Sequence, residues 1–337
     1  MKTKEKLLEV KNLKVNFHNE DGLIKAVDDV SFHIDTVETL GVVGESGCGK
    51  SVTCLSIMGL IPLRGKIEGG NINYYKEGRE AVEITSLDPH GEEIRAIRGK
   101  EIAMIFQEPM TSLNPVYPVG EQIMEAIRIG QQAYTKSEVR ERAIKMLKLV
   151  DIPAPEQRMA EYSFQFSGGM RQRAMIAMAL SRNPSLLIAD EPTTALDVTI
   201  EAQILYLMKD LRDKLNMSII FVTHDLKVIG EMADWVIVMY AGKIVEKASV
   251  EDIFYNSKHP YTQGLLKSIP QIGIKKRLVS IEGSVPKLTH LPQSCYFAPR
   301  CSKSMDICRS QEPPVFKIGD GHEVKCWLYG KEERISE

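Results

Sequence analysis

The chain has 337 residues, enough for more than one domain, and its 43% hydrophobic and 26% charged content is typical of globular proteins. Its formal net charge of −2, with no long block of one sign, leads us to expect no nucleic-acid partner, because such binding rests on a basic face. The charged start and the absence of an apolar stretch of ~20 residues predict a soluble protein whose membrane role would come through partners.

The first predicted elements are strands. Residues 7–35 and 66–106 read as short strands broken by Gly and Asn turns. Between them, Leu40–Val43 reads as an apolar strand that leads through a glycine-rich loop into a helix.

That loop reads Gly-Glu-Ser-Gly-Cys-Gly-Lys-Ser and has the spacing of a phosphate-binding loop. Glycines let successive backbone N–H groups face a phosphate, and the helix that follows adds its positive N-terminal end. We expect Lys50 to reach the outer phosphates of ATP and the Ser51 hydroxyl to bind Mg²⁺. The predicted nucleotide contacts in this segment are Gly44, Glu45, Ser46, Gly47, Cys48, Gly49, Lys50, Ser51 and Val52.

Cys48 lies inside this loop and is interpreted first as a small residue that fits a tight turn. The helix-end amides and Lys50 nevertheless predict a lowered thiol pKa. We therefore expect a thiol reagent to inactivate the protein and ATP to protect it.

Residues 119–182 are predicted to be helical. Thr135 and Glu138 have the spacing of a capping box at the start of one of these helices. One apolar stripe follows this cap, and its members are Val139, Ala143, Met146, Leu147 and Val150.

Buried strands of the parallel kind are predicted at Leu186–Ala189 and Ser218–Val222. The alternation of strands with helices indicates an α/β core, in which ligands bind at the carboxyl ends of the strands. Asp190 and Glu191 follow the first of these strands, and we assign Asp190 to the Mg²⁺ shell and Glu191 to the attacking water. His224 follows the second strand and Gln107 ends the apolar run Ile102–Phe106, so both are candidates for the same crevice.

A second anion-binding helix start is predicted at Phe166-Ser167-Gly168-Gly169-Met170. A simple kinase or GTPase needs no such duplicate. Together with the phosphate loop, Asp190-Glu191, Ala195-Leu-Asp197 and His224 in this order, the segment resembles the nucleotide-binding domain of ATP-binding-cassette (ABC) proteins. The family signature is usually Leu-Ser-Gly-Gly-Gln, and here Phe166 and Met170 replace its outer residues.

The resemblance implies a P-loop ABC ATPase core, which has a mixed sheet, an antiparallel β subdomain and a helical subdomain at about residues 110–182. It also implies a head-to-tail dimer in which ATP lies between one subunit's phosphate loop and the other's Ser167, Gly168 and Gly169. Phe17 would then stack on adenine, Gln107 would sense Mg²⁺ and couple to membrane subunits, and Asp197 would brace the dimer.

The resemblance further implies a set of partners at the cytoplasmic face of a membrane: two integral-membrane permease subunits, a second identical or homologous ATPase subunit and, indirectly, an extracytoplasmic solute-binding protein. A soluble ABC ATPase of DNA repair or translation is the alternative. Such proteins usually carry two cassettes or long coiled coils, and this chain shows neither.

The tail predicts a second domain. We place the division at residues 1–255 and 256–337, because prolines and four cysteines gather beyond it. The segments His259–Gly264 and Cys295–Cys301 resemble the C-terminal extension of oligopeptide and dipeptide importer ATPases, and relatives with this extension also serve nickel or sugar import.

Because the sequence shows no secretory signal, we expect a reducing compartment, where clustered thiols favour a bound metal over disulfides. The spacing of Cys295, Cys301, Cys308 and Cys326 does not select a metal. The resemblance implies that these four residues hold a [4Fe–4S] cluster. Zinc is the stronger alternative, and a set of free cysteines in a loop-rich tail is the other.

Overall fold

The described residues form two units, neither of them continuous in sequence. The structure is a computed structural model that describes residues 5–20, 22–76, 78, 80–107, 112–129, 134–194, 196–269, 281–286, 288–289 and 291–330. Unit 1 comprises Met1–Leu7, Asp35–Glu38 and Leu87–Val222. Unit 2 comprises Leu8–Ile34, Thr39–Ser86 and Thr223–Glu337.

Unit 1 contains a parallel sheet of strands β6 (Ile102–Ile105), β7 (Leu186–Asp190) and β8 (Ser218–Thr223) in the order β8-β7-β6. Its register pairs Ile105 with Ala189 and Asp190 with Val222. Strands β7 and β8 are buried at every residue, as their unbroken apolar runs predict. The carboxyl ends of β6 and β7 therefore lie side by side.

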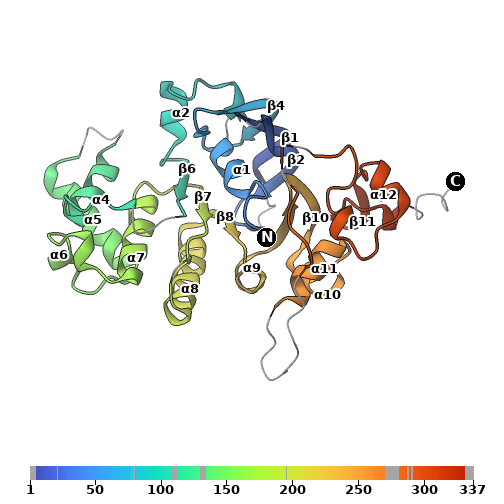
Figure 1. Ribbon diagram of the computed structural model, residues 1–337. Coiled ribbons are helices and arrows are strands. Elements are labelled where there is room, and N and C mark those ends of the chain that lie inside the picture. Colours follow the sequence, from blue (N-terminus) through green and yellow to red (C-terminus); the bar gives the residue numbers. More distant parts are fainter. Residues whose placement is uncertain are drawn as a thin grey trace. The chain divides into compact units, whose positions relative to one another are not determined.

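The helices of unit 1 include the predicted helical subdomain, in which α4, α5 and α7 pack against one another (Figure 1). The Thr135 capping box is confirmed, since the Glu138 N–H donates to Thr135 and the Glu138 carboxylate accepts from the Thr135 N–H. These helices are α2 (Glu92–Ile97), α4 (Val119–Arg128), α5 (Lys136–Leu149), α6 (Pro155–Arg158), η2 (Ser163–Gln165), α7 (Gly168–Leu180) and α8 (Val198–Leu215).

Unit 2 contains two sheet segments. One has the order β2-β1-β4-β5, and the other has the order β11-β12-β10-β9-β3, in which only β3 and β9 are shown parallel and the other described pairs are antiparallel. The strands are β1 (Lys6–Asn19), β2 (Gly22–Asp35), β3 (Thr39–Val43), β4 (Gly65–Tyr74), β5 (Val82–Glu83), β9 (Trp235–Tyr240), β10 (Lys243–Ser249), β11 (Phe316–Gly319) and β12 (His322–Val324).

The C-terminal extension joins the second sheet of unit 2 directly. Strand β12 pairs with β10, which places Val324 opposite Glu246, and Phe316, Val324 and Cys326 form a small buried cluster beside that pair. The helices of unit 2 are α1 (Lys50–Ile57), η1 (Ile84–Ser86), α9 (Leu226–Met232), α10 (Val250–Asn256), α11 (Pro260–Lys267), η3 (Ala298–Arg300), α12 (Asp306–Ser310) and η4 (Trp327–Tyr329).

The fold class predicted from the sequence is confirmed, with two differences in the strands. Residues 7–35 form two strands of 14 residues each, longer than the predicted short strands. The segment 66–106 is not all strand, because a polar stretch with Glu92 and Glu93 in its first turn forms helix α2. The division at residues 255 and 256 stays a prediction. Among the described residues, no helix is both long enough and apolar enough to cross a bilayer.

Candidate active site

The phosphate loop of unit 2 connects β3 to α1 and requires two of its glycines for steric reasons. Gly49, the N-cap of α1, has a φ of 102°. A Cβ atom there would lie 2.3 Å from the Ala26 carbonyl oxygen. At Gly44 a Cβ atom would lie 2.2 Å from the Met239 carbonyl oxygen. Larger residues would push the loop off its neighbouring strands.

Lys50 holds this loop from within. Its side chain is only 5% exposed, and its Nζ donates to the carbonyl oxygens of Gly44 at 2.7 Å and Glu45 at 3.2 Å. Ser46 and Gly47 are exposed at the tip, and Ser51 is half-buried at the start of α1. The loop therefore presents its backbone amides and one ammonium group at the end of a helix, a combination suited to a phosphate.

The predicted lowering of the Cys48 pKa is wrong. Cys48 is 1% exposed, and burial raises the pKa of its thiol more than the neighbouring Lys50 lowers it. Its sulfur lies against Gly44, where a Cβ atom would approach it to 2.7 Å. The alternative interpretation, a small residue that fits a tight loop, agrees with this packing.

We therefore expect Cys48 to resist alkylation in the native protein. A raised pKa leaves less thiolate at neutral pH and burial blocks the reagent, so labelling should be at least about tenfold slower than in urea. Peptide mapping by mass spectrometry after iodoacetamide treatment, with and without urea, measures the difference. Rapid stoichiometric labelling of native Cys48, suppressed by ATP, would contradict this expectation.

Glu191 and Gln107 are brought together at the carboxyl ends of β7 and β6 in unit 1. The Gln107 Nε2 donates to Glu191 Oε2 at 3.3 Å, and the Thr194 hydroxyl donates to the same oxygen at 3.0 Å. Glu191 has a φ of 48°, and its N–H donates to the Val222 carbonyl at 2.9 Å. The carboxylate is thus oriented by two side chains at the point where β7 ends.

Thr194 is a partner of Glu191 that the sequence analysis missed. It lies three residues after Glu191, and the turn between them is closed by the Thr194 N–H donating to the Glu191 carbonyl at 3.2 Å. A hydroxyl at that spacing after a strand-end carboxylate is the signal that would have indicated it. Asp190, the last residue of β7, is 3% exposed.

The predicted signature helix begins as expected. Ser167 is the N-cap of α7, and its hydroxyl accepts from the Met170 N–H at 3.3 Å. Ser167 and Gly168 are exposed, so this helix start faces outward from unit 1. Gly169 is buried, and a Cβ atom there would lie 2.8 Å from the Ile200 side chain of α8.

Asp197 is the N-cap of α8, and its Oδ1 accepts from the N–H groups of Thr199 at 3.1 Å and Ile200 at 3.0 Å. The same Ile200 packs on Gly169, so this cap also fixes the base of the signature helix. The brace across a dimer stays a prediction, and Ala195 of that motif lies outside the described residues.

The remaining candidates lie in unit 2. Phe17 is half-buried near the end of β1, opposite Gly65, where a Cβ atom would lie 2.6 Å from the Phe17 ring. His224 follows β8 and is exposed. The adenine-stacking role of Phe17 and the catalytic role of His224 stay predictions.

The four cysteines of the extension all lie in unit 2, and two of them, Cys295 and Cys308, contact each other through their backbones. Burial raises the pKa of the Cys326 thiol to about 11. The Cys295 N–H donates to the Cys308 carbonyl at 3.0 Å. Backbone N–H groups also reach the sulfurs of Cys295, Cys301 and Cys326.

All six cysteines are free thiols. Within the described ranges, no group of three or more His, Cys, Asp or Glu side chains is arranged to hold a single metal ion. The four free cysteines supply the thiolate chemistry that a cluster needs, but within the described residues their sulfurs are not grouped around one site.

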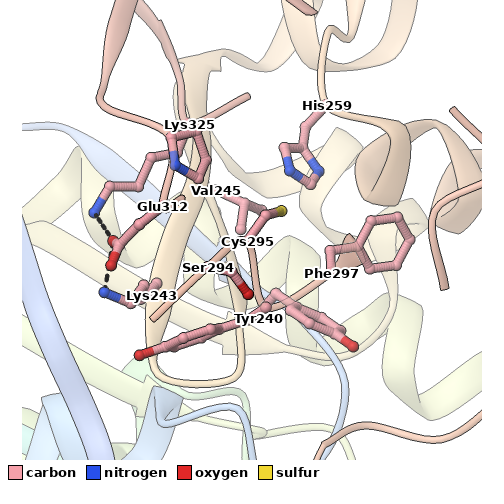
Figure 2. Close-up of a pocket in the computed structure, with 11 residues that line it drawn as sticks. Tyr240, Lys243, Val245, His259, Ser294, Cys295, Phe297, Glu312 and Lys325 are labelled. Carbon is pink, nitrogen blue, oxygen red and sulfur yellow. Dashed lines mark hydrogen bonds and ion pairs between the residues drawn. The ribbon is translucent and has the colours of Figure 1, made fainter. Parts of the chain in front are cut away.

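Cys295 borders a small pocket between the extension and strands β9 and β10 (Figure 2). Figure 2 shows Glu312 between Lys243 and Lys325, with N···O distances of 2.6 Å and 3.0 Å. Lys243 also contacts Asp28 of β2 at 3.0 Å. This charged network therefore ties the extension to the sheets that support the phosphate loop.

The sequence pattern of the ABC transporter family matches residues 27–194, and that of the oligopeptide/dipeptide transporter C-terminal region matches residues 245–308. The chain is 52% identical to the oligopeptide transport ATP-binding protein OppD of Bacillus subtilis, a match that covers 96% of this chain and 89% of that protein. It is 48% identical to the dipeptide transport ATP-binding protein DppD of Lactococcus lactis, over 96% of this chain and 91% of that protein.

Among solved structures, a dimeric ATP-binding cassette in a post-hydrolysis state, with bound ADP and phosphate, superimposes with a TM-score of 0.62. It is 28% identical to this chain and covers 72% of it, with 99% of its own length matched.

Proposed function

Because this chain belongs to the ATP-binding proteins of ABC transporters, we propose that it hydrolyses ATP to drive the uptake of di- or oligopeptides through partner permeases. The observation that carries the peptide substrate is the match of residues 245–308 to the C-terminal region of oligopeptide/dipeptide transporters. Relatives named for peptide transport, at about half identity over nearly the whole chain, support this substrate over nickel or sugar.

The proposed phosphate contacts are the amides of the loop and the Lys50 ammonium group, which would exchange its carbonyl partners for phosphate oxygens. Phe17 would carry the adenine. Mg²⁺, an ion that prefers oxygen ligands, would be held by the Ser51 hydroxyl, the Asp190 carboxylate and the Gln107 amide oxygen, and would neutralise phosphate charge. These donors fit the ion chemically.

Glu191 would orient the attacking water and accept its proton, with Gln107 and Thr194 holding the carboxylate in place. His224 would contact the outer phosphate. The start of α7, at Ser167, Gly168 and Gly169, would bind the phosphate held by a second ATPase subunit. Ser167 and Gly168 are exposed, so a second subunit could approach this helix start. Asp197 would brace that dimer.

We further propose that the dimer binds two integral-membrane permease subunits at the cytoplasmic face of the cell membrane. A solute-binding protein outside would deliver peptide to those permeases without touching this chain. The test is reconstitution in lipid vesicles with candidate permeases and a candidate solute-binding protein, followed by ATPase assays with peptides, nickel or sugars. Stimulation by peptides is expected, and stimulation by nickel or a sugar alone would replace the peptide assignment.

The proposed resident group of the extension is a [4Fe–4S] cluster held by Cys295, Cys301, Cys308 and Cys326. Its support is the occurrence of four free thiols in one short segment of the chain. The role would be structural, because these four cysteines lie far in sequence from every ATP motif. Zinc stays the alternative.

Anaerobically purified protein should be brown and contain about four iron and about four sulfide per chain. The Cys301→Ser variant should lose the colour and expose the extension to proteolysis, while ATP binding at Lys50 is weakened but not abolished. Iron analysis, absorption spectra and limited proteolysis measure these effects, and Ser302→Ala, at an exposed neighbour, is the matched control. Colourless protein with one zinc per chain would overturn the cluster and keep the four-thiol site.

A further inference from the structure

The C-terminal extension contacts the phosphate loop itself, at Glu45. Arg300, which immediately precedes Cys301, forms a two-pronged ion pair with Glu45: Nη1 lies 2.6 Å from Oε2 and Nη2 lies 2.9 Å from Oε1. The Arg300 side chain is only 5% exposed. The Glu45 side chain is 30% exposed, and a partly buried, bidentate pair of this kind fixes geometry better than a surface ion pair.

Arg300 is also held on its other sides, by two carbonyl groups of the extension and by the end of β9. Its Nε donates to the Glu282 carbonyl at 3.0 Å, and its Nη2 donates to the Ile281 carbonyl at 3.3 Å. Its Nη1 also approaches the Tyr240 hydroxyl at 3.4 Å. The guanidinium group is thus oriented before it meets Glu45, so little of its own freedom is lost in forming the pair.

Tyr261 of α11 supplies a second contact with the same loop residue. The Glu45 N–H donates to the Tyr261 hydroxyl at 3.0 Å. Tyr261 is fully buried, and burial is the main cause that raises the pKa of its phenol, so it stays neutral. The Tyr261 ring packs on Tyr240, with 4.7 Å between ring centroids, and on Phe297, with 5.4 Å.

The loop from Cys295 to Cys301 is anchored by the residues between its cysteines. The Phe297 ring packs edge-on against Tyr240, with 5.2 Å between ring centroids, and lies near His259, with 5.7 Å. Figure 2 shows these residues around Cys295. The Tyr296 hydroxyl donates to Asp28 at 2.9 Å. Arg300 therefore projects from a loop that is fixed along its length.

Every polar group of Glu45 is consequently occupied. Its N–H is bonded to Tyr261, its carboxylate to Arg300, and its carbonyl oxygen accepts from the Lys50 ammonium group at 3.2 Å. The first two partners belong to the extension, and the third is the lysine proposed to bind phosphate. The position of Glu45 therefore links the extension to the group that would meet ATP.

We propose that Arg300 and Tyr261 are positioning residues for the phosphate loop, which act through Glu45 to set the affinity for ATP. This inference rests on the proposed ATPase function. A loop ordered in advance loses less freedom when ATP binds, so removal of its supports weakens binding. The supports act equally on bound ATP and on the transition state, so the loss should appear in KM and leave kcat nearly unchanged.

The first test is Arg300→Gln in the full chain. The KM for MgATP should rise roughly 5- to 20-fold while kcat changes by less than about twofold, because one partner of a partly buried, two-pronged charge pair has been removed. Arg300→Lys keeps the charge but not the two-pronged geometry, so its KM for MgATP should lie between those of Arg300→Gln and the wild type. Arg309→Gln, at an exposed arginine of the same extension, is the matched control and should leave KM unchanged.

The second test separates action through Glu45 from general loosening. In a double-mutant cycle, Arg300→Gln should have little further effect on the KM for ATP in a Glu45→Gln background. Tyr261→Phe removes only the hydroxyl that accepts the Glu45 N–H, and should raise the KM for ATP roughly threefold. This variant tests the same proposal even if Arg300→Gln does not fold. A wild-type KM in both Arg300→Gln and Tyr261→Phe, or fully additive effects of Glu45→Gln and Arg300→Gln, would overturn the proposal.

These outcomes are distinct from failure of the proposed function. If the wild-type chain neither binds nor hydrolyses ATP, the ATPase function itself fails. If the wild type hydrolyses ATP and the Arg300 and Tyr261 variants match it, only the positioning role fails.

Discussion

Replacement of Glu191 by Gln should reduce ATP hydrolysis by roughly 10²–10⁴-fold and leave ATP binding intact, because the variant keeps the shape but loses the base. In unit 1 the Gln107 amide and the Thr194 hydroxyl both donate to the Glu191 carboxylate, and these two bonds fix its orientation. The glutamine variant should retain one of these bonds through its amide oxygen. Because the variant binds ATP but hydrolyses it slowly, it should accumulate as an ATP-bound dimer.

Single-turnover hydrolysis and size-exclusion chromatography with MgATP measure these two effects. Glu141→Gln, at an exposed glutamate of α5, is the matched control and should hydrolyse ATP at the wild-type rate. Near-normal turnover in Glu191→Gln would show that another group activates the water. Thr194→Val should have a smaller effect, since it removes only one of the two donors to the carboxylate.

Features that depend on short stretches of chain were predictable from the sequence. The phosphate loop follows from a strand, a set of glycines and a helix within a dozen residues, and the Thr135 cap follows from one residue spacing. The meeting of Gln107 and Glu191 followed from two strands that end in polar residues, because parallel neighbours share a carboxyl edge.

Features that depend on distant contacts were not predictable in this way. Glu45 and Arg300 are 255 residues apart, and no local pattern marks either of them as the other's partner. The Cys48 error has a different cause: the sequence shows Lys50 nearby but not how deeply the thiol is buried, and burial outweighs that charge. The extension, expected to be a separate module, contributes β12 to the edge of β10.

The Ser167→Arg variant should lose ATP-driven dimerisation and on the order of 10² in hydrolysis, because its helix end would no longer reach the phosphate in the other subunit. Nucleotide binding by the monomer should survive, since the variant leaves the phosphate loop of unit 2 unchanged. Arginine also removes the cap that Met170 uses, which costs about 1 kcal/mol of helix stability. Ser167→Ala removes the same cap without added bulk, and separates the two effects.

A mixture of Ser167→Arg chains with Lys50→Ala chains tests the head-to-tail geometry. Each variant alone should be inactive, but a mixed dimer has one composite site in which the Lys50 of one chain faces the Ser167 of the other. Activity should therefore return on mixing, in proportion to the mixed dimers counted by native mass spectrometry. If mixed dimers form and no activity returns, there are two explanations: Ser167 acts within its own subunit, or hydrolysis needs both sites of the dimer intact.

A dimer of one wild-type chain and one chain with both substitutions distinguishes them. If Ser167 acts within its own subunit, the wild-type chain of this dimer still hydrolyses ATP; if Ser167 acts across the dimer, neither site is complete and the dimer is inactive.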